Sequence, residues 1–334
     1  MFEISNRSLR SSDRTWFSQV NSQRRLGVSE KRRGSSNSTR LVLDGAELRH
    51  LTSGAIWSEG PVWLAARGSL RWSDIPGNRI LEYNLVSGVT SVYATDVEFA
   101  NGRTLDHSGA VIQCSHGRRA IERDLNGRVT TLVDSWNGHR LNSPNDVIVA
   151  NDGAIWFTDP PYGIVQAHEG RLGEREYGAN FVFRFDPIGG VIEPVATDLE
   201  EPNGLAFSPG ERVLYVSDTS VALRSDGTGN HHIRAYDVGP GFSLSNSRVF
   251  VVITPGVSDG LRVDRLGNIW TSSADAVQVF SPDGVLIDRI PVPEVVGNIC
   301  FGGEHGTTLF IAATTSIYSI ETSVTDATFA RVKS

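Results

Sequence analysis

One unit of sequence occurs six times along this chain of 334 residues and constrains its fold more than any other feature. Each unit opens with a glycine turn and runs into a short apolar strand: GSLRWSD from Gly68, GAVIQCS from Gly109, GAIWFTD from Gly153, GERVLYVSD from Gly210, GNIWTSS from Gly267 and GTTLFIAA from Gly306. Successive units start 41, 44, 57, 57 and 39 residues apart, and a further strand follows each one. A period of about 40 to 50 residues with several short strands is typical of β-propellers. We therefore predict an all-β fold, a six-bladed β-propeller.

A polar residue begins the strand that precedes each unit. It is the middle residue of the triplets SEG, ANG, PND, PNG, SDG and GNI, seven to nine positions before the glycine of its unit. These residues are Glu59, Asn101, Asn145, Asn203, Asp259 and Asn298. Because the innermost strands of a propeller surround its central channel, we predict that the six side chains form a ring at one channel mouth. Turn formation is the alternative reading, since Asn and Asp before Gly favour tight turns, but it does not account for Glu59.

The composition indicates a globular protein. Hydrophobic residues make up 39% of the chain, and no run of 18 apolar residues is present, so we expect no membrane span and a cytoplasmic location. Cys114 and Cys300 both lie in apolar strands and are predicted to be buried thiols. Residues 1–40 carry a net charge of +6 and the remainder −13, which argues against a nucleic-acid partner.

The chain divides into two parts. Residues 1–38 form a basic, Ser- and Arg-rich stretch without apolar periodicity, which we predict to be a flexible extension, with an organelle transit peptide as the less favoured reading. We predict that residues 39–334 form the propeller, which is then expected to be the catalytic domain. One of the two segments TRLVLDG and ELRHLTSG is expected to supply the outer strand of the last blade and close the ring. The oligomeric state is expected to be a monomer or a homodimer.

Two insertions account for the two spacings of 57 residues. They span residues 158–179 in the third unit and 218–230 in the fourth, and each follows a second strand. In a meander, the loop between the second and third strands lies on the same face as the start of the first strand. Side chains of these loops are therefore candidates to cover the channel mouth: His116, Arg118, Tyr162, Glu174, Glu176, Asp218 and His231.

The donor atoms of the predicted ring are oxygens of carboxylates and amides, with no His or Cys among them. Oxygen ligands favour hard cations, and Ca²⁺ accepts irregular oxygen sites more readily than Mg²⁺ does. We therefore predict a divalent metal, most favourably Ca²⁺, with Zn²⁺, Mn²⁺ or Mg²⁺ as alternatives. Such a cation can polarise a carbonyl group for attack by water, which suits the hydrolysis of esters or lactones. The chain has no G-x-S-x-G, P-loop, H-E-x-x-H or C-x-x-C motif.

Five ordered motifs within residues 42–320 resemble those of the senescence-marker-protein/gluconolactonase/luciferin-regenerating-enzyme family, particularly its bacterial gluconolactonases. These are SEGPVW, LNSPNDVIV, GAIWFTDPPYG, EPNGLAFS and SDGLRVD. The resemblance implies a six-bladed propeller with one catalytic divalent cation and hydrolysis of sugar lactones. By position, Glu59, Asn203 and Asp259 match metal ligands of the family, and Asn145 matches an amide that binds the metal or the substrate. Asp259 also matches the residue usually proposed as general base.

The resemblance has one clear departure. Animal members carry a substrate-binding Arg two residues before the position of Asn145, and this chain has Ser143 there. Arg118 or Arg119 is a candidate substitute, and Glu174 resembles a substrate-binding Glu of the animal members. The predicted substrate-binding residues are Asn145, Asn101, Asn298, His116, Arg118, Tyr162 and Glu174.

The prediction is a metal-dependent lactonase acting on a small molecule such as glucono-1,5-lactone, with Glu59, Asn145, Asn203 and Asp259 as metal ligands and Asp259 as base. A phosphotriesterase-like hydrolase on the same metal site is one alternative, because a metal that polarises C=O also polarises P=O. A non-catalytic, Ca²⁺-stabilised binding propeller is the other.

Overall fold

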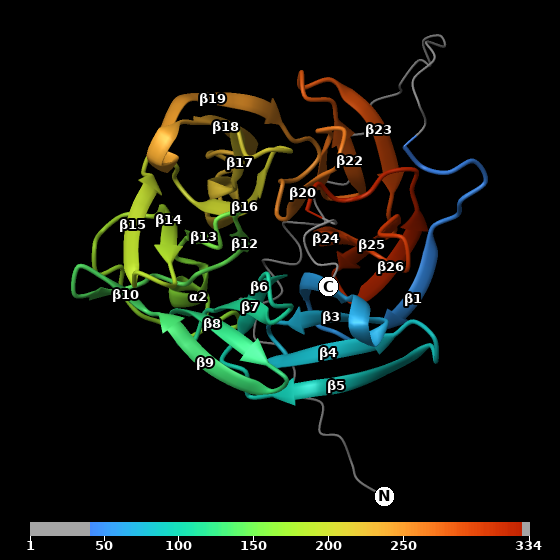
Figure 1. The fold of residues 1–334 in the computed structure, drawn as a ribbon, viewed down its shortest axis with the longest axis horizontal. Helices are drawn as coiled ribbons and strands as arrows, with labels where there is room; N and C mark the ends of the chain where they lie inside the picture. Colours follow the sequence, from blue (N-terminus) through green and yellow to red (C-terminus); the bar gives the residue numbers. More distant parts are fainter. Residues whose placement is uncertain (1–40, 329–334) are drawn as a thin grey trace, which may run out of the picture.

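The computed structural model describes residues 41–328. The predicted extension, residues 1–38, lies outside these residues. Six four-stranded antiparallel sheets surround a central axis (Figure 1), which confirms the predicted six-bladed propeller. No helix within residues 41–328 is both long and apolar enough to cross a membrane.

Blades 1 to 3 each contain four strands that follow one another in sequence, from the innermost to the outermost. Their bounds are β2 (Ser58–Leu64), β3 (Ser69–Asp74), β4 (Arg79–Asn84) and β5 (Val89–Thr95) in blade 1; β6 (Ala100–Leu105), β7 (Val111–Ser115), β8 (Ala120–Leu125) and β9 (Arg128–Val133) in blade 2; and β12 (Val147–Val149), β13 (Ile155–Asp159), β14 (Phe181–Asp186) and β15 (Val191–Ala196) in blade 3. The small ribbon β10 (Ser135–Trp136) and β11 (His139–Arg140) connects blades 2 and 3.

Blades 4 and 5 repeat this order. Their strands are β16 (Pro202–Phe207), β17 (Val213–Asp218), β18 (His232–Val238) and β19 (Leu244–Val252), then β20 (Leu261–Val263), β21 (Ile269–Ser272), β22 (Ala276–Phe280) and β23 (Leu286–Pro291). Blade 6 contains β24 (Val296–Gly302), β25 (Thr308–Ala313) and β26 (Ser316–Glu321), and its outermost strand is β1 (Arg49–Ser53). The N-terminal segment ELRHLTSG therefore closes the ring by pairing with β26.

The apolar core lies in the seams between blades. Trp156 of blade 3 packs edge-to-face on Phe207 of blade 4 with ring centroids 5.1 Å apart, and Trp270 of blade 5 packs likewise on Phe301 of blade 6 at 5.4 Å. The second strands are covered on both faces, which explains their continuous apolar sequence. Cys114 and Cys300 are buried free thiols, as predicted.

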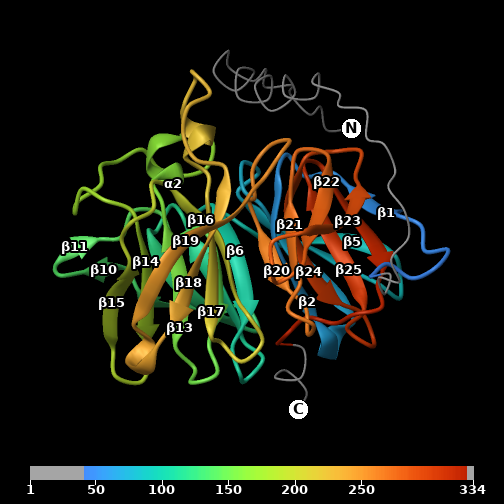
Figure 2. The same ribbon diagram turned by 90° about the horizontal axis from the view of Figure 1, so that it is seen from above.

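The two insertions form short helices on one face of the propeller. The blade 3 insertion contains α2 (Tyr162–Val165) and the blade 4 insertion contains the 3₁₀ turn η3 (Ser220–Leu223). Figure 2 shows both projecting from the same face. Two further 3₁₀ turns, η2 (Ala65–Arg67) and η4 (Pro240–Phe242), join strands elsewhere. The insertions therefore stand over the mouth where the innermost strands begin.

Candidate active site

The predicted ring residues lie where the innermost strands are irregular. The pairing register between the first and second strands shifts beside Glu59, Asn101, Asn203 and Asn298. In blades 3 and 5 the innermost strands start two residues after the ring residue. An irregularity of this kind bends the strand and re-aims its side chains. This local departure from the regular alternation brings the ring residues to the channel mouth.

Close packing between blades draws the ring residues together. The amide nitrogen of Gly204 donates a hydrogen bond to the carbonyl oxygen of Asp259 at 2.9 Å, and a Cβ on Gly204 would lie 2.3 Å from that oxygen. A Cβ on Gly260 would lie 2.0 Å from Cγ of Asn298. A Cβ at Gly204 would require the backbone of the adjacent blade to shift, and a Cβ at Gly260 would displace the Asn298 side chain. Gly204 of PNG and Gly260 of SDG therefore allow the close approach of neighbouring blades at the ring, in addition to any role in a tight turn.

A cavity of about 270 Å³ opens at this mouth. Five predicted ring residues line it: Glu59, Asn101, Asn145, Asn203 and Asp259. Asn298 does not. Its side chain is buried against Gly260, and its Oδ1 accepts a hydrogen bond from the amide of Ile299 at 2.8 Å. The insertions supply the opposite wall: Tyr162, Gln166 and Glu169 from blade 3, and Thr219, Val221, Ala222, Arg224, Ser225 and Gly227 from blade 4.

Three carboxylates face this cavity and perturb one another. Burial and the charge of Asp259 hold the pKa of Glu59 well above its usual range. Burial and the charge of Glu169 raise the pKa of Asp259 to about 7, and burial and the charge of Glu59 raise the pKa of Glu169 to about 7. Like charges in a site of low dielectric disfavour ionisation in this way. Perturbed carboxylates that converge in a cleft mark a candidate functional site.

The residues present fit a divalent cation. Glu59 is only 4% exposed, and its Oε1 is buried without a hydrogen-bond partner, although Oε2 accepts one from the amide of Gly60. Glu59, Asn145, Asn203 and Asp259 line the same cavity, and a donor set of carboxylate and amide oxygens is one that Ca²⁺ accepts. A cation there would offset the mutual repulsion of the carboxylates.

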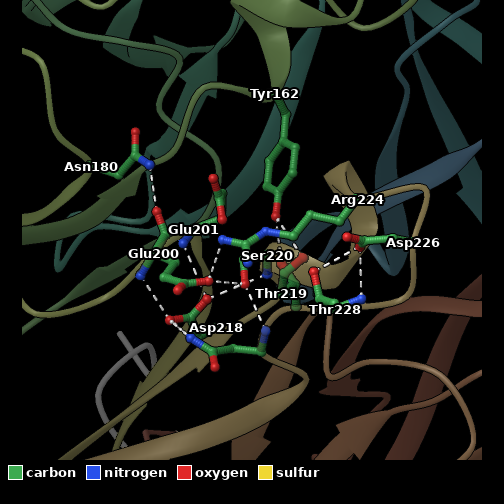
Figure 3. A network of polar contacts seen from close by, with 11 residues as sticks. Tyr162, Asn180, Glu200, Glu201, Asp218, Thr219, Ser220, Arg224, Asp226 and Thr228 are labelled. Carbon is green, nitrogen blue, oxygen red and sulfur yellow. Dashed lines mark hydrogen bonds and ion pairs between the residues drawn. The ribbon is translucent and has the colours of Figure 1, made fainter.

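A second acidic cluster lies at the base of the blade 4 insertion (Figure 3); two of its members, Glu200 and Asp218, have partners, and Oε2 of Glu201 is buried without one. It consists of Glu200, Glu201 and Asp218, whose ligand oxygens lie within 4.8 Å of one another. Asp218 accepts hydrogen bonds from the backbone amides of Glu200 and Glu201 at 2.8 and 3.1 Å, and Arg224 pairs with Glu200 at 2.7 Å. These bonds tie the insertion to the blade. We therefore place the candidate metal centre at the ring.

Of the seven loop residues predicted to cover the channel mouth, Tyr162 lines the cavity and the other six do not. His116 lies directly behind the ring, with its Nε2 at 3.0 Å from Nδ2 of Asn101. Arg118 pairs with Glu122 at 2.8 Å, and Glu174 is exposed, with its carbonyl oxygen accepting a bond from Arg119. The remaining three, Glu176, Asp218 and His231, also lie outside the cavity lining.

Ser143, at the position where animal members of the resembled family carry Arg, forms hydrogen bonds that hold the structure together. It is fully buried, and its hydroxyl donates to the carbonyl oxygen of Pro160 at 2.6 Å and accepts from the amide of Gly163 at 3.0 Å. These bonds fix the start of the blade 3 insertion. Arg119 does not replace the missing Arg, because its guanidinium binds the carbonyl oxygen of Leu141 and does not border the cavity.

Sequence reasoning missed Glu169, Thr219 and Arg224, which all line the cavity. Glu169 and Arg224 lie in insertions without periodicity, where sequence alone gives no side-chain direction. Thr219 did leave a signal, because it follows the second strand of its blade directly, as His116 does in blade 2.

Comparison with known proteins identifies the wider group. The family model described as "SMP-30/Gluconolactonase/LRE-like region" matches residues 57–315. A gluconolactonase of Zymomonas mobilis is 33% identical over 80% of this chain and 78% of its own length. The pentonolactonase XacC of Haloferax volcanii is 27% identical over 76% of this chain and 80% of its own. The structure of a gluconolactonase from Xanthomonas campestris superposes with a TM-score of 0.78 and 40% identity, covering 85% of this chain and 91% of that one.

Proposed function

Because the chain belongs to the SMP-30/gluconolactonase/LRE-like family, we propose that it is a divalent-cation-dependent lactonase that opens sugar lactones such as glucono-1,5-lactone to aldonic acids. Lactone hydrolysis agrees with the names of its bacterial and archaeal relatives. The observation that carries the proposal is the convergence of Glu59, Glu169 and Asp259, beside amide oxygens, on one small cavity.

The ring residues of this chain would hold the cation. We assign this role to Glu59, Asn145, Asn203 and Asp259, with Ca²⁺ as the first choice for an irregular oxygen site. When bound, the cation would act as a Lewis acid toward the lactone carbonyl and stabilise the negative charge that develops on its oxygen.

Asp259 is the proposed general base. Water adds to the carbonyl carbon, the ring C–O bond breaks, and the former ring oxygen leaves as a hydroxyl group once it has gained a proton. Asp259 takes the proton from the attacking water. The positive charge of a cation beside Asp259 would keep its carboxylate ionised, so that it can accept the proton.

The insertions are proposed to hold the rest of the substrate. Gln166, Glu169 and Arg224 offer polar groups to the hydroxyls of a sugar lactone, while Val221 and Ala222 cover its apolar edges. Asn101 lies on the ring side, where its amide can reach a substrate oxygen. The cavity of about 270 Å³ lies just below the range of roughly 300–1,000 Å³ for small-molecule sites, which favours a substrate of monosaccharide size.

A pH-stat assay of glucono-1,5-lactone tests the proposal. The protein is stripped with EDTA and then assayed with Ca²⁺, Zn²⁺, Mn²⁺ or Mg²⁺ restored. We expect acid release that disappears with the chelator and returns with the cation. Activity that persists in fully stripped protein would contradict cation dependence. Turnover of an aryl phosphotriester without turnover of any lactone would favour the phosphotriesterase alternative.

A further inference from the structure

Two equivalent positions place a hydrogen-bonding side chain directly behind a ring amide. His116 follows β7 in blade 2 and Thr219 follows β17 in blade 4, each as the first residue after the second strand. His116 Nε2 lies 3.0 Å from Nδ2 of Asn101, and Thr219 Oγ1 lies 3.1 Å from Nδ2 of Asn203. Both are buried, with Thr219 only 1% exposed. The same place in the repeat therefore contacts the nitrogen of the ring amide in two blades.

The contacts of His116 fix which atom of Asn101 it can bind. Its Nδ1 lies 2.9 Å from the carbonyl oxygen of Glu169, which can only accept, so Nδ1 must carry the proton. Burial lowers the pKa of His116 to about 4, so near pH 7 the ring is neutral and Nε2 is an acceptor. Only the Nδ2 of Asn101 can donate to it. The Oδ1 of Asn101 is then left for the channel.

Asn203 has an equivalent contact, with Tyr162 on the far side of Thr219. The hydroxyl of Tyr162, on α2 of the blade 3 insertion, lies 2.6 Å from Oγ1 and 3.4 Å from the carbonyl oxygen of Thr219 (Figure 3). In the shorter contact either hydroxyl can be the donor. Whichever hydroxyl donates, Oγ1 of Thr219 keeps a lone pair for the amide nitrogen, and it accepts a hydrogen bond from Nδ2 of Asn203 at 3.1 Å. The Oδ1 of Asn203 is again left for the channel.

We propose that His116 and Thr219, the latter backed by Tyr162, are positioning residues that turn the amide oxygens of Asn101 and Asn203 into the cavity. The inference rests on the proposed function, since it assigns the Asn203 oxygen to the cation and the Asn101 oxygen to the substrate. Partners behind a ligand that fix its orientation are worth 10- to 100-fold in metal affinity or activity when removed. Tyr162 thereby also couples the blade 3 insertion to the blade 4 ring residue.

Thr219→Val is the decisive variant, because it removes the hydroxyl and keeps the shape of the side chain. Cation affinity is measured by calorimetric titration of stripped protein with Ca²⁺ and by luminescence of Tb³⁺ sensitised by Trp57, which lines the cavity. We expect a 10- to 100-fold weaker affinity, with a smaller loss of the same kind in Tyr162→Phe. Thr219→Ser keeps the hydroxyl and should bind the cation nearly as the unaltered protein does.

Thr308→Val is the matched control. Thr308 is a buried residue that begins β25, and its hydroxyl donates to Glu321 at 2.9 Å, away from the cavity. Thr308→Val should leave cation affinity unchanged.

The contact between His116 and Asn101 is tested separately. His116→Phe should raise KM for the lactone about 10-fold or more, with cation affinity retained. His116→Gln keeps a hydrogen-bond acceptor and should partly restore KM.

The outcomes separate this inference from the proposed function. If unaltered protein binds Ca²⁺ and hydrolyses the lactone, but Thr219→Val and Tyr162→Phe bind Ca²⁺ as tightly as it does, the positioning role is wrong and the lactonase proposal stands. An unchanged KM in His116→Phe would likewise show that His116 does not position the amide of Asn101. If unaltered protein binds no cation and opens no lactone, the proposed function itself has failed.

Discussion

Replacing Asp259 with Asn should separate catalysis from folding. The two side chains have the same shape, but the amide cannot take a proton from water. A general base contributes about 10²- to 10⁴-fold, so kcat should fall by that factor when the cation is saturating. The variant should fold, because Asp259 side-chain contacts are confined to the cavity and the backbone bonds from Gly204 and to Ser272 remain.

The same substitution should stabilise the protein when no cation is bound. Burial and the charge of Glu169 raise the pKa of Asp259 from 3.8 to about 7 in the folded state. A carboxyl with a raised folded-state pKa loses stability as pH rises between those two values, and each pKa unit is worth about 1.4 kcal/mol. Asn in this place should therefore increase the free energy of unfolding by up to about 4 kcal/mol at pH 8, where the Asp is ionised. Near pH 4 the gain should vanish.

Urea denaturation of EDTA-treated protein at pH 5 and pH 8, with pH-stat rates at saturating Ca²⁺, would measure both effects. Asp283→Asn is the control, since Asp283 is exposed in a turn of blade 5 and the same chemical change there should alter neither quantity. Retained turnover in Asp259→Asn would refute the base assignment. A lower free energy of unfolding for Asp259→Asn at pH 8 would refute the reasoning that burial and neighbouring negative charges destabilise the ionised carboxylate.

Three further changes test other parts of the site. Glu59→Gln should weaken Ca²⁺ binding at least 10-fold in calorimetric titration while the circular dichroism of the cation-free protein is unchanged, because a buried carboxylate ligand becomes a neutral amide. Glu169→Gln should move the acidic limb of the pH–kcat/KM profile to lower pH, because removing a neighbouring negative charge lowers the pKa of Asp259; a limb that stays in place would contradict this coupling. Gly204→Ala should cost about 1–3 kcal/mol in urea denaturation, since its Cβ would meet the carbonyl oxygen of Asp259 at 2.3 Å.

Much of the fold could be predicted because each blade has its own local signal. The glycine turn and apolar second strand recur, so the number of blades and the register of the ring residues follow from counting. The sequence does not decide which of two segments supplies the closing strand, since both have strand-like patterns and only pairing with β26 distinguishes them. The Asn298 side chain shows the limit of the repeat: its backbone position is equivalent, but close contact with Gly260 keeps it away from the cavity.

The insertions were the part that sequence could not place in detail. Periodicity fixes side-chain direction in a strand, and an irregular loop has none, so Tyr162 was placed over the cavity while Glu169 and Arg224 were missed. Because Ser143 stands where animal members carry a substrate-binding Arg, the sequence suggests Arg118 or Arg119 as a substitute. In the structure neither of them lines the cavity, and Arg224 lines the wall opposite the ring. Which loop residue faces a cavity depends on tertiary contacts such as the bond from Gly163 to Ser143.

The ring and the insertions have different proposed roles: the ring residues carry out the reaction, and the insertions select the substrate. The ring is built from bulged inner strands and close glycine contacts, so the backbone positions of its residues cannot move without displacing adjacent strands. The insertions rest on the blade surface through side-chain bonds such as Arg224 to Glu200, which can change without disturbing the core. Changes at Gln166 or Arg224 should therefore alter KM among lactones, and changes at the proposed cation ligands of the ring should alter kcat for all of them. The bond from Tyr162 to Thr219 is where the two parts meet, so a change there should affect both constants.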